Sequence, residues 1–244
     1  MAPEKKPPRV VVVGGSEGLG GAIALLFARL DFEVVLAGKD DKRLHATARK
    51  LGRGATAYPV DVSSREELKH FFDRVGDIEH LVLAFSGNQG AGPFVTLSLE
   101  RLREGFESKV WPHLQVAQLA LQALQPRASI TFVTSATASS SLPGTTGMAS
   151  INGALEALVR PLAVEVAPVR VNAVSPGVVD SPQFARMSAE AKDSFFAQMT
   201  RMLPARRIGR VDEIAEAVYF VATNGFMTGE IVRVDGGGHL GRPR

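Results

Sequence analysis

The sequence predicts an α/β fold: a single Rossmann-type, doubly wound domain in which a parallel sheet of about seven strands is flanked by helices on both faces. Three observations predict it. Short runs of Val, Ile and Leu without polar alternation are typical of strands buried on both faces. Segments with apolar residues at helical spacing alternate with these runs, which indicates right-handed βαβ units. A glycine-rich turn joins the first run to the first helical segment.

The elements follow one another in a regular order. The expected strands are Arg9–Val13, Glu33–Ala37, Thr56–Val60, His80–Phe85, Ser129–Thr134, Arg170–Val174 and Ile231–Val234. The expected helices are Leu19–Leu30, Lys42–Leu51, Ser64–Arg74, Leu99–Leu124, Ser150–Glu165 and Val211–Ala222. Pro112 falls inside the longest helical segment and is expected to kink it. No repeat or linker interrupts the alternation, so residues 1–244 are expected to form one domain, with a flexible N-terminus at 1–8.

Residues 180–210 depart from this alternation. Among polar residues they carry an apolar set, namely Phe184, Met187, Phe195, Phe196, Met199 and Met202. Two compatible interpretations follow. The segment is a helical insert that packs on the core, or it is a loop or lid over a substrate, because long insertions in compact α/β domains are usually functional.

Composition excludes several classes of function. The chain has no cysteine, so disulfides, thiolate catalysis and Cys-ligated zinc are excluded, and its five histidines lack metal-ligand spacing, so no metal is expected. The net charge of +3 comes from scattered basic residues, which gives no reason to expect a nucleic-acid partner. No apolar run is long enough to span a membrane, and the polar, Pro-rich start is unlike a signal peptide. A cytoplasmic location is therefore expected.

The first strand runs directly into the sequence GGSEGLG at positions 14–20. Its first glycine permits a tight turn, its third lets the backbone approach a pyrophosphate, and its last allows the helix to pack on the strand. The N-terminus of the following helix offers free N–H groups to the anion. Such a loop is typical of a site for a dinucleotide cofactor. The residues of this loop that we expect to bind that cofactor are Gly14, Ser16, Glu17, Gly18 and Leu19.

The end of the second strand bears on the choice of cofactor. A carboxylate there would hold a ribose 2′-hydroxyl, but Gly38 leaves room and Lys39 offers a charge to a 2′-phosphate. NADP(H) is therefore preferred over NAD(H). The alternative is that Lys39 is a solvent-exposed turn residue.

Further segments follow in an order that resembles the short-chain dehydrogenase/reductase family. They are Asp61-Val62, Ser86-Gly87, the stretch NAVSPGVVDS at 172–181 and VDGG at 234–237, and the resemblance covers residues 9–238. It implies hydride transfer to or from a nicotinamide, and a homodimer or homotetramer built on the 99–124 and 150–165 helices. Glu17 argues against NADP(H), because NADP-preferring members often carry a basic residue near it. The resemblance adds these cofactor-binding residues: Asp61, Val62, Ser86, Gly87, Asn152, Pro176, Gly177, Val179 and Ser181.

The catalytic positions depart from the family. In the family a Tyr hydroxyl supplies a proton, a Lys four residues later lowers the Tyr pKa, and a Ser orients the carbonyl. Ser135 has the spacing of that Ser, but Met148 stands in the place of the Tyr and Asn152 in the place of the Lys. The chain's two tyrosines are followed four residues later by Val62 and Thr223, so no Tyr-x-x-x-Lys exists.

Lys109 occupies the place of a family Asn that lies on the preceding long helix. The family's Asn and Lys thus appear exchanged between Lys109 and Asn152, so that a positive charge persists beside the nicotinamide. Burial or the neighbouring Arg160 would lower the Lys109 pKa and make it a proton donor. The alternative is a surface Lys, and His113 is expected to serve packing or a subunit contact. The candidate catalytic residues are Ser135, Lys109, Asn152 and Met148.

Three functions remain open at this point. The first is an atypical NADP(H)-dependent oxidoreductase that acts on a small apolar carbonyl, imine or activated alkene. The second is a cofactor-binding regulator without turnover, and the third is a non-redox cyclase or isomerase that uses the same pocket. Under the first and third, the partner is a small-molecule substrate.

Overall fold

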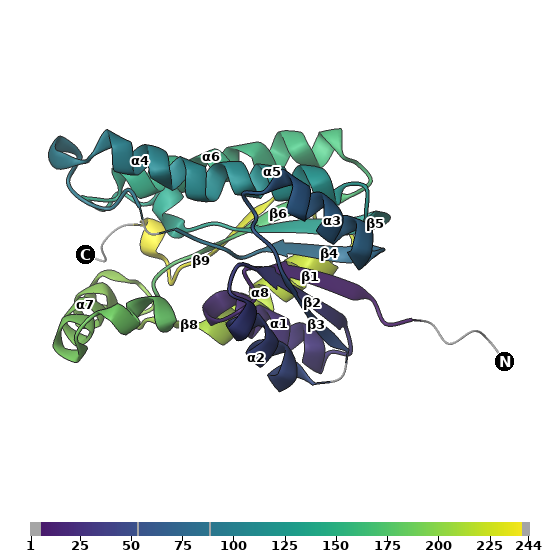
Figure 1. Cartoon of the computed structure of the whole chain (residues 1–244). Helices are drawn as coiled ribbons and strands as arrows, with labels where there is room; N and C mark the ends of the chain where they lie inside the picture. Colours follow the sequence, from purple (N-terminus) through teal and green to yellow (C-terminus); the bar gives the residue numbers. More distant parts are fainter. Residues whose placement is uncertain (1–5, 53, 88, 241–244) are drawn as a thin grey trace.

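The computed structural model describes residues 6–52, 54–87 and 89–240 (Figure 1). Its core is a seven-stranded parallel sheet with the order β3-β2-β1-β4-β5-β6-β9, which confirms the predicted fold class. The strands are β1 (Arg9–Val13), β2 (Glu33–Gly38), β3 (Ala55–Pro59), β4 (Ile78–Leu83), β5 (Leu124–Val133), β6 (Arg170–Pro176) and β9 (Ile231–Val234). The strand order reverses between β1 and β4, because β2 and β3 are added on one side of β1 and the later strands on the other, and ligands bind at such a switch point in open α/β sheets. Most of the terminus predicted to be flexible, residues 1–5, lies outside the described residues.

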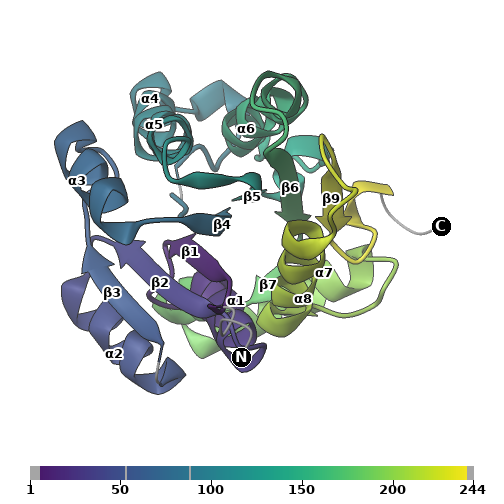
Figure 2. The same ribbon diagram turned by 90° about the vertical axis from the view of Figure 1, so that its right-hand side faces the viewer.

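Helices cover both faces of the sheet (Figure 2). On one face lie α1 (Gly18–Arg29), α2 (Asp41–Leu51) and α8 (Val211–Thr223). On the other lie α3 (Arg65–Val75), α4 (Leu99–Gly105), α5 (Trp111–Ala120) and α6 (Thr146–Glu165). Among the described residues, no helix combines the length and the apolar character needed to cross a membrane.

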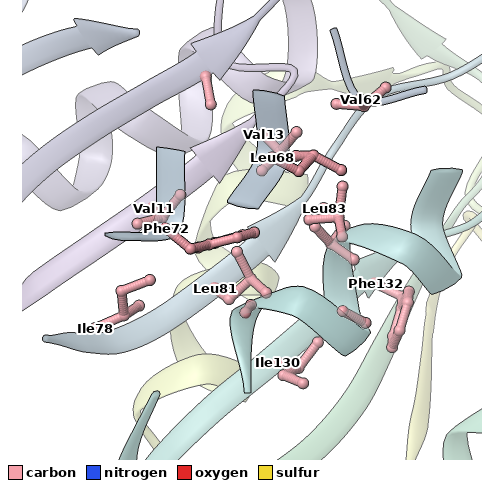
Figure 3. Close-up of a cluster of buried hydrophobic side chains, with 14 of the residues drawn as sticks. Val11, Val13, Val62, Leu68, Phe72, Ile78, Leu81, Leu83, Ile130 and Phe132 are labelled. Atoms are coloured by element: carbon pink, nitrogen blue, oxygen red, sulfur yellow. The ribbon is translucent and has the colours of Figure 1, made fainter. Parts of the chain in front are cut away.

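The core on the α3, α5 and α6 face holds the strands in register. Figure 3 shows Val11 of β1, Leu81 of β4 and Phe132 of β5 in one cluster with Leu68 and Phe72 of α3. All five side chains are buried. Burial of each such side chain contributes about 1.5–3 kcal/mol. The carboxyl ends of these strands are thereby fixed side by side, and the loops that follow them meet at one edge.

The prediction of one helix over Leu99–Leu124 is wrong, because this segment is not a continuous α-helix. It consists of α4, a π-helical turn η2 (Phe106–Val110) and α5, and the chain then enters β5 at Leu124. The N–H of Trp111 bonds the carbonyl of Phe106, five residues back. Pro112 follows at once, and its missing N–H explains why the regular ladder is interrupted here. The first turn of α6 also starts earlier than expected, at Thr146 rather than Ser150.

The insert at 180–210 consists of η4 (Pro182–Arg186) and α7 (Ala189–Met202), and α7 stands to one side of the sheet in Figure 1. Its base is closed by β7 (Val179–Asp180), which pairs in parallel with β8 (Gly209–Arg210). Three aromatic rings, those of Phe184, Phe195 and Phe196, pack on one another with centroids 5.2–6.0 Å apart. The insert is therefore an ordered subassembly with two anchored ends.

Candidate active site

The loop that follows β1 is shaped so that only glycine fits at its key positions. Gly14 and Gly18 have φ angles of +85° and +60°. A Cβ on Gly14 would lie 2.6 Å from the backbone N of Phe85, and a Cβ on Gly20 would lie 2.1 Å from the carbonyl oxygen of Gly14. The N-cap residue Glu17 makes no side-chain hydrogen bond to the first turn of α1. The amide groups of that turn are thus available to an anion such as a pyrophosphate.

Charged side chains gather where β2 and β3 end. Lys39 Nζ lies 3.0 Å from Asp61 Oδ1. Arg43, in the first turn of α2, pairs with Glu17 Oε1 and, at 3.1 Å, with Asp40 Oδ2. Two cations, Lys39 and Arg43, are therefore held by acidic partners at the side of the glycine loop. Because both cations are exposed, each can exchange its partner for a phosphate.

A cavity of about 1140 Å³ opens beside this region. The predicted site residues that line it are Ser86, Gly87, Lys109, Ser135, Met148, Asn152, Pro176 and Gly177. Another group lies outside its lining, around the ends of β1, β2 and β3: Gly14, Ser16, Glu17, Gly18, Leu19, Lys39, Asp61 and Val62. Val179 and Ser181 do not line it either, and the Val179 side chain is buried in the core. The predicted residues therefore fall mainly into two regions. The catalytic candidates and some of the cofactor-binding candidates line the cavity, and most other cofactor-binding candidates lie around the strand ends.

The two regions meet at the base of the insert. A Cβ on Gly18 would come within 3.8 Å of Pro182 Cδ. From there the insert forms an apolar wall of the cavity with Phe184, Met187, Phe195, Met199 and Met202. The insert therefore lines the cavity, whereas its packing on the core stays a prediction. Its motion as a lid stays a prediction.

A chain of hydrogen bonds connects Lys109 to Ser135. Lys109 Nζ donates to Asn152 Oδ1 at 2.8 Å, and Asn152 Nδ2 donates to Thr137 Oγ1 at 3.3 Å. Thr137 Oγ1 then donates to Ser135 Oγ at 3.1 Å. Asn152 Nδ2 also donates to the Met148 carbonyl at 2.8 Å. Because an ammonium only donates and a carbonyl only accepts, the orientation of the Asn152 amide is fixed, and the three bonds donated in turn by Lys109, Asn152 and Thr137 lead from the charge to Ser135.

The charge at the start of this chain is buried. Lys109 is only 3% exposed, so it is not a surface residue. Burial lowers the pKa of Lys109 to about 8, although attraction to Glu156 opposes the shift. Arg160, which the sequence offered as a second cause, lies exposed on α6. Burial is therefore what weakens the hold of Lys109 on its proton.

His113 is a packing residue. It is fully buried, its Nδ1 lies 2.7 Å from the Lys109 carbonyl, and its ring centroid lies 3.8 Å from that of Phe85. Burial first, and then the charge of Lys109, lower the pKa of His113 to about 3. A neutral ring in this position adds no second charge beside Lys109.

Met148 faces the cavity from the first turn of α6. Its position is set by close packing, because a Cβ on Gly147 would lie 2.5 Å from the Gly90 carbonyl, to which the Met148 N–H also bonds. A thioether has no exchangeable proton. Among the described residues that line the cavity there is no tyrosine.

Sequence reasoning missed three residues. Arg43 lies four positions after Lys39, and its charge was a usable signal. Thr137, in the short helix η3 (Ala136–Ser139), stands in a Ser/Thr-rich stretch that singles out no residue. His239, in η5 (Gly238–Leu240), lines the cavity, and its Nδ1 lies 2.8 Å from Oδ2 of Asp235. The four-residue spacing of Asp235 and His239 was the only hint of that pair.

The sequence and the structure of this chain are similar to those of known oxidoreductases. A family model described as "Enoyl-(Acyl carrier protein) reductase" matches residues 13–239. "Short-chain dehydrogenase/reductase ATR9" of Stachybotrys chlorohalonatus is 31% identical, over 95% of this chain and 96% of that protein. The human 3-oxoacyl-[acyl-carrier-protein] reductase is 28% identical, over 93% of this chain and 95% of that protein. A crystal structure of a small-chain dehydrogenase in complex with NADPH has a TM-score of 0.84 and 29% identity, and the match covers 96% of this chain and 100% of that chain.

Proposed function

Because the chain belongs to the short-chain dehydrogenase/reductase family, we propose that it is an NADPH-dependent reductase of a small, apolar carbonyl, imine or activated alkene that works without a tyrosine. The observation that carries the proposal is the chain of donors from Lys109 through Asn152 and Thr137 to Ser135. It ends in a cavity that Phe and Met side chains of the 180–210 insert also line. A solved relative binds NADPH in the same fold.

The residues present fit a dinucleotide. The glycine loop leaves room for a pyrophosphate against the amides of α1, and the exposed cations Lys39 and Arg43 offer charge to a 2′-phosphate. At the other end, Pro176 and Gly177 line the cavity, and only glycine fits at position 177, because a Cβ there would lie 2.6 Å from Asp235 Cα. When bound, the reduced nicotinamide supplies the hydride.

The protein's own contribution is polarisation. Ser135 Oγ accepts from Thr137, which leaves its own proton to be donated to the oxygen or nitrogen of a substrate. As negative charge develops on that atom, the aligned bonds from Lys109 stabilise it, because hydrogen bonds in a chain reinforce one another at low local dielectric. The Asn152 amide in the middle does not pass protons along. The chain therefore makes Ser135 a stronger hydrogen-bond donor and does not by itself protonate the product.

Titration calorimetry with NADPH, followed by NADPH oxidation with ketones, cyclic imines and enones, tests this function. We expect NADPH to bind and to be oxidised with at least one of these classes. Binding without turnover of any class would favour a cofactor-binding regulator, and an absence of binding would contradict the proposal.

Lys39→Ala is expected to weaken NADPH binding about 10- to 100-fold, because a charge-assisted bond to a phosphate contributes about 1.5–3 kcal/mol, while NADH binding changes little. Glu17→Gln is expected to act in the opposite direction. It removes the carboxylate that pairs with Arg43 and so frees this guanidinium for the 2′-phosphate. Calorimetry with both cofactors measures the two effects. Equal changes for NADPH and NADH would place the 2′-phosphate elsewhere.

We also propose that the protein assembles as a homodimer or homotetramer through the outer surface of α4, α5 and α6. Large apolar side chains on these helices are exposed in the single chain, among them Leu99, Trp111 and Val164. Such exposed apolar surfaces commonly mark contacts between subunits.

A further inference from the structure

The cavity contains a second ionisable group that the chain from Lys109 does not involve. His239 follows β9, in η5, and lines the same cavity as Ser135 and Lys109. We propose that His239, held by Asp235, is the acid that protonates the reduced substrate and so replaces the absent phenol. This inference rests on the proposed reductase function.

Asp235 fixes which nitrogen of His239 faces a ligand. Asp235 Oδ2 lies 2.8 Å from His239 Nδ1 and accepts the His239 N–H at 2.9 Å, and Oδ1 accepts the Gly237 N–H at 3.0 Å. Burial raises the pKa of Asp235, but these hydrogen bonds outweigh it and hold the pKa below its ordinary value. A carboxylate only accepts, so Nδ1 carries a proton. Nε2 is then the ring nitrogen that remains for a molecule in the cavity.

The fold brings this pair to the Ser135 side of the cavity. η5 packs against η3, which begins directly after Ser135. Arg233 Nε of β9 donates to Ser139 Oγ of η3 at 3.1 Å and fastens the two segments together. Asp235 itself lies against Gly177, one of the residues expected to bind the cofactor. A substrate bonded to Ser135 is therefore bounded by the element that carries His239.

In the proposed step a ketone gains a hydride at carbon and a proton at oxygen. The carbonyl carbon gains the hydride that NADPH supplies, and the electron pair of the C=O π bond moves to the oxygen, which Ser135 holds by a hydrogen bond. The proton on Nε2 of the His239 imidazolium transfers to that oxygen. The products are the alcohol, NADP⁺ and a neutral His239 whose Nδ1–H still bonds Asp235. Proton donation by a positioned side chain commonly contributes about 10²–10⁴ in rate.

The alternative is that Asp235 and His239 only stabilise the turn after β9, and a pair of substrates separates the two roles. Reduction of 1-tetralone needs a proton, whereas reduction of the similarly shaped N-methyl-3,4-dihydroisoquinolinium ion needs hydride alone. For His239→Gln we expect about a 100-fold lower kcat with 1-tetralone, an iminium kcat changed by less than about threefold, and unchanged NADPH affinity. Equal losses for both substrates, or no loss for the ketone, would overturn the inference.

A matched control is available in α2. His45 Nδ1 lies 2.7 Å from Asp41 Oδ1, also at a spacing of four residues, but on an exposed helix face outside the cavity. His45→Gln is expected to leave both reactions unchanged. A loss of ketone reduction in this variant would show that removal of any Asp–His pair suffices, and the assignment of His239 would fall.

A second measurement does not depend on turnover. In ¹⁵N NMR spectra of the NADP⁺ complex, we expect the neutral ring of His239 to carry its proton on Nδ1, and we expect the Nε2 resonance to move when 1-tetralol is added. Two results would overturn the placement of His239: a proton on Nε2 in the neutral ring, or an Nε2 chemical shift that does not change when 1-tetralol is added. A wild type that binds NADPH but reduces no compound would instead contradict the proposed function.

Discussion

Lys109→Met is expected to make the protein more stable and less active at the same time. The folded protein holds the Lys109 proton less tightly than the unfolded chain does, because burial lowers its pKa from 10.5 to about 8. Each pKa unit corresponds to about 1.4 kcal/mol, so the buried charge costs the folded state about 3 kcal/mol at neutral pH. Methionine fills a similar volume without this cost. Because Asn152 loses its donor, we expect a net gain of about 1–3 kcal/mol in the free energy of unfolding.

The pH dependence of this gain identifies its cause. The cost of the charge is complete below pH 8 and disappears as the pH rises from 8 to 10.5. The difference in stability between Lys109→Met and the wild type, measured by urea unfolding, is therefore expected to shrink over that range. Lys50→Met, at the exposed end of α2, is the control and should leave stability nearly unchanged at every pH.

The activity of the same variant is expected to fall about 100-fold or more, because a removed electrostatic contact to developing charge commonly costs about 10²–10³ in kcat. Ser135 keeps its hydrogen bond from Thr137 but loses the charge at the far end of the chain. A structural Lys would show the reverse pattern. Lower stability with unchanged kcat would therefore exclude Lys109 from the site.

Gly20→Ala is expected to abolish NADPH binding and to destabilise the fold. Its Cβ would lie 2.1 Å from the Gly14 carbonyl oxygen, a backbone atom that moves only if the loop opens. Overpacking of this kind costs about 1–3 kcal/mol, and the displaced loop no longer directs the amides of α1 at a pyrophosphate. Thermal unfolding and calorimetry with NADPH measure the two effects.

The adjacent residue supplies the control. A Cβ on Gly21 meets nothing closer than the Gly15 carbonyl oxygen at 3.9 Å. Gly21→Ala is therefore expected to bind NADPH normally and to stabilise α1 by about 0.5–1 kcal/mol, because Gly is a poor helix former. If both variants bound NADPH like the wild type, the glycine loop would not be the pyrophosphate site.

The sequence allowed the sheet and the cofactor region to be predicted because their signals are local. Buried parallel strands are continuous apolar runs, and a glycine loop after the first strand has few alternative roles. The strand ends were harder to predict. β5 begins at Leu124, whereas the sequence predicted a start at Ser129. The first residues of the strand were missed because some of them, such as Arg127, are polar and exposed and so lack the apolar character of a buried strand. β7 and β8 are pairs of residues with no periodicity at all.

The candidate site was predictable only in part, for a different reason. The exchange between Lys109 and Asn152 came from resemblance, and the two side chains are indeed hydrogen-bonded. Thr137 and His239 escaped because their roles depend on contacts between distant segments. His239 reaches the Ser135 side only because β9 joins the sheet beside β6 and the chain then turns back over η3. No residue spacing in the sequence predicts that the chain turns back in this way.

The π-helical turn at Phe106–Val110 has a consequence for how this chain tolerates insertions and deletions. Each residue of an α-helix advances the side chains by roughly 100° around the axis, and the wider turn absorbs part of that advance. No single helical wheel therefore describes α4 and α5 together. Removal of one residue here would straighten the helix but rotate His113 and Val116 away from the sheet, where both are now fully buried. Lys109 lies within the same turn, which sets the rotation of α5 about its axis. A change of length in this turn would therefore alter both the inward direction of the Lys109 side chain and the packing of α5 on the sheet.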